Sequence, residues 1–104
     1  MRFFKFTVIF TPEKDEPDTY NVTVPALPEI ASFGESFEEA RFMAQDALEL
    51  VVLSRLEEDE SIPQDKKPTR LAKNAKVEEM LVTVAHQVNA TPSSYVKTAI
   101  FQSA

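Results

Sequence analysis

Acidic side chains are the residues of this sequence best suited to do chemistry. The chain has 17 Asp and Glu among its 104 residues, and four of them are consecutive: Glu57, Glu58, Asp59 and Glu60. Paired carboxylates can act as acid and base, or bind a divalent cation, when a fold holds them together in a dry cleft. The acids here fall on the solvent side of a predicted helix or at its end, and none lies on the inward face of a predicted strand. We therefore expect them to solubilise the chain and to bind a partner protein.

Other reactive residue types are scarce. The sequence has no Cys, one Gly and one His, His86. These counts exclude thiol nucleophiles, disulfides, Cys-based zinc sites and Gly-rich phosphate loops. A single His gives no basis for a nucleophile triad. The sequence therefore predicts no catalytic residue, no metal site and no cofactor, and we expect a protein that is not an enzyme.

Charge is distributed unevenly along the chain. The formal net charge is −6, with five basic against fifteen acidic side chains up to residue 65 and six basic against two acidic ones from residue 66 onward. An acidic body attracts basic partners and repels nucleic acid as a whole. The sequence thus favours a basic protein partner for its first two thirds.

The elements that position these charges follow from length and periodicity. The chain is 43% apolar with eight Phe, enough for one folded domain. Apolar residues alternate over residues 3–10 and again over 20–24, the pattern of strands with one buried face, and a Pro-rich and acidic turn joins them. We expect residues 30–33 to form a short third strand that ends at Gly34. We expect the first two strands to form an antiparallel hairpin.

A long helix is predicted to follow. Ser36 and Glu39 have the spacing of a capping box, which predicts a helix from Phe37 to about Glu58. One broad apolar stripe should pack on the sheet: Phe37, Ala40, Met43, Ala44, Ala47, Leu48, Leu50 and Val51. A second strip is predicted to lie on the opposite side and to form the interface of a homodimer or tetramer: Phe42, Leu53 and Leu56.

After the helix, the spacing of apolar residues leaves one segment open between strand and helix. Residues 57–73 read as a solvated linker. Residues 77–88 match both strand and helical spacing, and their consecutive β-branched residues favour a strand. Thr91 and Pro92 suit a helix start, so a short C-terminal helix is expected over 92–101, with Tyr95 and Ile100 reaching the oligomer interface. We predict an α+β domain over residues 1–86 and a tail over 87–104.

Several short motifs occur together over about residues 3–86: the first strand, Val22–Pro28, Gly34–Ser36, Glu38–Ala40, Leu56–Glu58, Ile62–Pro63 and Val77–Val84. In these motifs the sequence resembles the HicB family of antitoxins. The family usually has Gly and then Cys or Val after a Leu-Pro pair, where this chain has Glu29 and Ile30.

The resemblance implies a β-β-β-α-β domain, likened to a degenerate ribonuclease H fold, in which one long helix packs on a small, mostly antiparallel sheet. It implies a protein that binds a small basic ribonuclease toxin of the HicA type and neutralises it by occlusion. We expect the chain to be cytoplasmic, because the sequence shows neither a signal-peptide apolar region nor a stretch long enough to span a membrane. The acidic run of residues 57–60 (Glu57, Glu58, Asp59 and Glu60) is the candidate toxin-binding site. No membrane association is expected.

A DNA-binding autorepressor is the alternative. Full-length members of the family commonly carry a DNA-binding module, and residues 66–104 would form a ribbon-helix-helix here if 77–88 were helical. Lys67, Arg70 and Lys73 would then contact DNA. The strand interpretation of 77–88 leaves too few residues for such a module, so DNA binding is not favoured.

Overall fold

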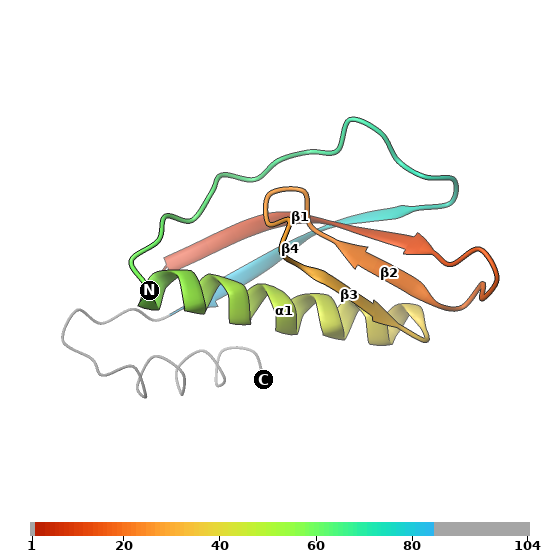
Figure 1. The fold of residues 1–104 in the computed structure, drawn as a ribbon, viewed down its shortest axis with the longest axis horizontal. Coiled ribbons are helices and arrows are strands. Elements are labelled where there is room, and N and C mark those ends of the chain that lie inside the picture. The colour runs from red at the N-terminus through yellow and green to blue at the C-terminus, as the bar shows by residue number, and fades with distance from the viewer. Residues whose placement is uncertain (1, 85–104) are drawn as a thin grey trace.

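The protein is an α+β domain in which one helix packs on a four-stranded antiparallel sheet (Figure 1). A computed structural model describes residues 2–84; the predicted C-terminal helix, Tyr95 and Ile100 lie outside the described residues. The strand order in the sheet is β3-β2-β1-β4. The elements, in chain order, are β1 (Arg2–Pro12), β2 (Tyr20–Thr23), β3 (Ala31–Gly34), α1 (Phe37–Glu57) and β4 (Lys76–Val84).

Strand β1 occupies the centre of the sheet. It pairs with β4 from Arg2 opposite Val84 to Phe10 opposite Lys76, and only its C-terminal end pairs with β2, from Ile9 opposite Thr23. The alternating residues of β1 are buried as the sequence predicted, because they face α1 and join the core. The segment 76–84 is a strand, which confirms the interpretation that the sequence favoured.

The start of α1 is fixed by its cap and by Gly34. The Glu39 N–H donates to Ser36 Oγ at 3.0 Å, as the capping box predicts. The Glu39 side chain reaches back one residue further than predicted, since its Oε1 accepts from the Glu35 N–H at 3.0 Å. A Cβ on Gly34 would lie 2.2 Å from the backbone nitrogen of Ala40. Only glycine lets β3 approach the helix backbone this closely.

Two predictions about the faces of α1 were wrong. Leu50, predicted to pack on the sheet, is 61% exposed. Leu53, predicted to contact a second chain, is 6% exposed and belongs to the core of its own chain, so little of its surface remains for an interface. Leu56 is half-buried against the same core, and of the predicted strip only Phe42 is largely exposed. Helical periodicity shows which residues share a face of a helix, but it does not show which other segments of the chain pack on that face.

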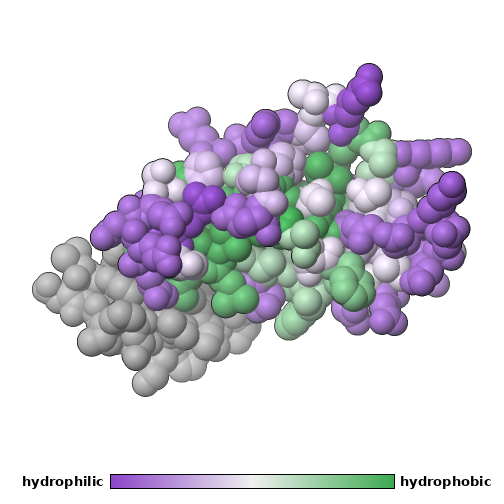
Figure 2. All heavy atoms as spheres, viewed as in Figure 1, coloured by the Kyte–Doolittle hydropathy of each residue, from purple (hydrophilic) through white to green (hydrophobic). Residues whose placement is uncertain are grey.

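The face of the domain seen in Figure 2 carries both apolar and hydrophilic side chains. Figure 2 shows apolar residues across the middle of one face and hydrophilic residues toward its two ends. Within residues 2–84, no helix is both long enough and apolar enough to span a membrane.

Candidate functional site

The acidic run lies where α1 ends. Glu57 is the last helical residue, Glu58 is the C-cap, and Asp59 turns the chain with a positive φ of 58°. The Glu60 N–H donates to the carbonyl oxygen of Arg55 at 2.8 Å, which holds this turn against the helix. All four acidic side chains are exposed. The sequence-predicted site is therefore a compact set of solvated carboxylates.

Electrostatic repulsion is built into this run. The neighbouring carboxyl of Glu60 raises the pKa of Glu58 above its ordinary value. The helix C-terminus adds a partial negative charge of its own. None of the four acids forms an ion pair with another of residues 2–84. A basic partner would relieve this repulsion. The four carboxylates are exposed to solvent, so they do not provide the dry cleft that acid–base catalysis needs.

Arg55, two residues before the acidic run, is bound to other groups of its own chain. Arg55 donates through Nη2 to Glu29 Oε2 at 2.8 Å and through Nη1 to the carbonyl oxygen of Ser61 at 3.3 Å. A hydrogen bond from the backbone and then that from Arg55 lower the pKa of Glu29. Arg55 thus ties the end of α1 to the loop before β3.

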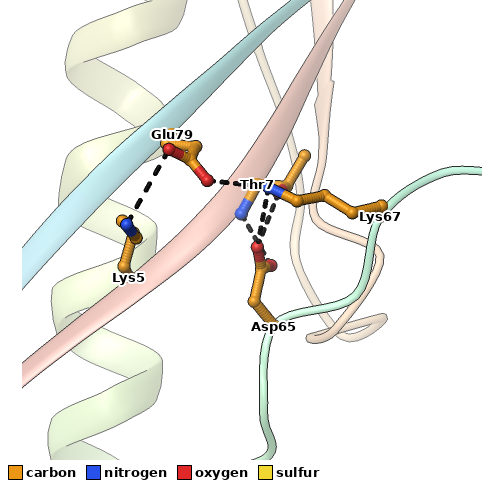
Figure 3. Close-up of polar contacts among 5 residues, drawn as sticks. All are labelled: Lys5, Thr7, Asp65, Lys67 and Glu79. Atoms are coloured by element: carbon orange, nitrogen blue, oxygen red, sulfur yellow. Dashed lines mark hydrogen bonds and ion pairs between the residues drawn. The ribbon is translucent and has the colours of Figure 1, made fainter.

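A second polar group lies on the face of the sheet away from α1 (Figure 3). We call it the polar cluster: Lys5, Thr7, Asp65, Lys67 and Glu79. Its centre is Thr7, which is fully buried although it alternates with the core residues of β1. The Thr7 N–H donates to Asp65 Oδ1 at 2.8 Å, and Thr7 Oγ1 donates to Asp65 Oδ2 at 2.7 Å.

Register explains why Thr7 needs this partner. Ile9 pairs with β2, and the Thr7 N–H points to the same side of β1, beyond the end of β2. The carboxylate of Asp65 therefore satisfies a backbone donor where the neighbouring strand is missing. Burial acts to raise the pKa of Asp65, but hydrogen bonds from Thr7, from the Lys66 backbone and from Lys67 together outweigh it and leave this pKa lowered.

Lys67 closes the polar cluster. Its Nζ donates to Glu79 Oε2 at 2.7 Å and to Thr7 Oγ1 at 3.1 Å, while Lys5 lies 3.9 Å from the other oxygen of Glu79. The bond to Glu79 raises the pKa of Lys67 and lowers that of Glu79. These contacts fasten residues 58–75, the connecting segment, along the sheet on its way back to β4 (Figure 1).

The linker interpretation of residues 57–73 was therefore incomplete. Ile62 also packs against the core. The sequence contained one signal, a Thr between the apolar positions of β1, but its partner lies 58 residues further along the chain. No periodicity links two residues at that separation.

The three cations predicted for DNA binding have different surroundings. Lys67 is paired with acids of its own chain, and Arg70 is exposed in the connecting segment. Lys73 instead lines an open hollow of about 570 Å³ near Lys14, Tyr20 and Lys76. Among residues 2–84, no group of three or more His, Cys, Asp or Glu is placed to hold a metal ion.

Solved structures of antitoxins share this fold. A chain of a toxin–antitoxin complex from Streptococcus pneumoniae matches with a TM-score of 0.65 and 16% identity, covering 97% of this chain and 89% of that one. The HicB antitoxin of Burkholderia pseudomallei matches with a TM-score of 0.59 and 19% identity, covering 95% of both chains. The N-terminal domain of that antitoxin gives 0.54 and 22%, covering 80% of this chain and all of that one.

Sequence comparisons identify the family. The UPF0150 protein Ta0767 of Thermoplasma acidophilum is 39% identical over 61 residues, which is 59% of this chain and 86% of that protein. The family model described as "HicB_like antitoxin of bacterial toxin-antitoxin system" matches residues 6–99. This match spans most of the chain, including all of the sheet from Phe6 onward and the whole of α1. The chain therefore belongs to the HicB-like family of antitoxins of bacterial toxin–antitoxin systems.

Proposed function

We propose that this antitoxin neutralises a small basic ribonuclease toxin of the HicA type by covering its RNA-binding surface. The family match over residues 6–99 is the observation that carries this proposal. The similar fold of a chain in the Streptococcus pneumoniae toxin–antitoxin complex supports a toxin as the partner. We place the encounter in the cytoplasm, where RNA is the toxin's substrate.

The charge of the described surface suits such a partner. A ribonuclease must attract RNA phosphates, so its working surface is basic, and an acidic protein competes for that surface. The four acids at the end of α1 are exposed and unneutralised, and they repel one another until a cation arrives. Occlusion requires binding alone, so we propose no catalysis by this chain.

Co-purification from the native host tests the proposal. The tagged chain should retain a small basic protein through washing at low salt and release it as salt rises, because exposed charge pairs are screened. The released protein should cleave RNA, and adding the antitoxin back should stop the cleavage. A chain that retains no basic protein, or a released protein without ribonuclease activity, contradicts the proposal.

DNA binding is the less favoured candidate. The predicted ribbon-helix-helix needed a helix over 77–88, and residues 76–84 form β4 instead. Lys67, one of its three proposed phosphate contacts, is held by Asp65 and Glu79. A nanomolar complex with operator DNA in a gel shift would reverse this preference. The predicted homodimer or tetramer is a separate prediction, to be measured by light scattering.

A further inference from the structure

We propose that the toxin docks on the outward face of α1, centred on Phe42 and Leu50, and that residues 57–60 lie at one end of this contact. The inference rests on the proposed function and names the surface that performs it. Phe42 is 69% exposed and Leu50 is 61% exposed, although both are large apolar side chains. They stand eight residues apart on one helix, separated by Asp46 and Glu49.

A small hollow lies beside Phe42 on this face. Phe42, Gln45, Asp46 and Glu49 line a cavity of about 90 Å³, roughly the volume of three water molecules. Gln45 closes one side, since its Nε2 donates to Glu49 Oε1 at 2.9 Å and to the carbonyl oxygen of Leu81 at 3.1 Å. A small apolar side chain of the partner can enter here between the ring of Phe42 and the acids.

The charge of this face selects a basic partner. Both cations of α1 are committed, because Arg41 pairs with Glu78 at 2.8 Å and Arg55 pairs with Glu29. Within residues 2–84, Glu38 and Asp46 form no ion pair. The helix therefore presents exposed apolar area among unneutralised carboxylates. Lys or Arg side chains around an apolar centre would complement it in both charge and polarity.

A second apolar surface lacks this selectivity. Large apolar side chains are also exposed on the sheet face away from α1: Phe3, Phe33, Val77 and Leu81. This face also carries the polar cluster, in which Glu79 and Asp65 pair with Lys5 and Lys67, and Lys5 lies opposite Leu81 in the register. This surface offers no excess charge to attract a basic protein, so it serves as the internal control.

Matched variants of the whole chain separate the two surfaces. The probe is the small basic toxin that co-purifies with the chain, inactivated for RNA cleavage and titrated by calorimetry. Phe42→Ala combined with Leu50→Ala should weaken binding by about tenfold or more. Large apolar side chains at the centre of an interface carry most of its affinity, and these two changes remove them. Phe33→Ala combined with Leu81→Ala should change the affinity less than about threefold.

A charge-reversal pair tests the electrostatic part of the proposal. Asp46→Lys should slow association at low salt more than Asp15→Lys, which changes the net charge equally.

Nuclear magnetic resonance gives a readout that needs no variant. Amide shifts caused by the toxin should concentrate on residues 38–50 and 57–60 and spare the polar cluster.

If the wild-type chain binds toxin while the α1 variants bind equally well, this surface is wrong and the proposed function stands. If the wild-type chain binds no toxin, both are overturned. If Phe42→Ala with Leu50→Ala splits a dimer of the free chain, the face serves a second copy, which also overturns the proposal.

Discussion

Asp65→Ala should destabilise the domain by removing the partner of a fully buried residue. The Asp65 carboxylate accepts from the Thr7 N–H at 2.8 Å and from Thr7 Oγ1 at 2.7 Å. Thr7 Oγ1 keeps a contact with Lys67, but the backbone N–H has no second partner in the polar cluster. Leaving one buried donor unsatisfied costs about 1 to 3 kcal/mol. For a domain of this size each kcal/mol lowers Tm by about 4 to 8 °C.

Urea unfolding followed by circular dichroism measures this loss. Asp65→Ala should lower the midpoint with an unchanged slope, and Asp65→Asn, which keeps one acceptor oxygen, should lose less. Asp15→Ala is the matched control, because Asp15 is an exposed acid of the hairpin turn with no ion pair among residues 2–84. If Asp65→Ala shifts the midpoint no more than this control, the connecting segment is not fastened to the sheet as described.

Three further predictions concern stability. Gly34→Ala should cost about 1 to 3 kcal/mol in urea, because its Cβ would meet the backbone of Ala40, and adding Ala40→Gly should not rescue it. Leu53→Glu should lower Tm by burying a charge at a cost above about 2 kcal/mol, while an equally stable variant would mean that Leu53 is exposed. The pKa of Asp65 is lowered on folding, so its stabilisation is complete above the ordinary Asp value of about 3.9 and is lost as pH falls below it. Acid titration should destabilise the wild-type chain more steeply than Asp65→Asn, and parallel curves would contradict this.

Local patterns were enough to predict the elements of the fold. Alternation over residues 3–10 and 20–24 and the capping pair of Ser36 and Glu39 depend on neighbours within four residues. The strands β1 and β2 and the start of α1 therefore appear where they were predicted. The type of residues 77–84 was ambiguous by spacing, and pairing with the long central strand β1 decides it.

The predictions that were wrong or incomplete depend on contacts between distant segments. Leu53 lies on the side of α1 opposite Ala44, yet both are buried, so the apolar stripe did not reveal what covers Leu53. Asp65 and Lys67 lie in a segment whose polar composition is typical of a solvated linker. They hydrogen-bond to Thr7 because β2 is too short to cover this part of β1. The candidate toxin surface shows the same limit. Leu50 was expected in the core, and its exposure beside Phe42 appeared only in the folded helix.

Inhibition of RNA cleavage tests the central claim most directly. The co-purified basic protein is incubated with RNA, and the antitoxin is added in increasing amounts at low and at high salt. We predict that cleavage falls to zero near a fixed molar ratio at low salt, and that more antitoxin is needed at high salt because screening weakens the charge pairs. Cleavage that continues in the presence of excess antitoxin at low salt would contradict the account.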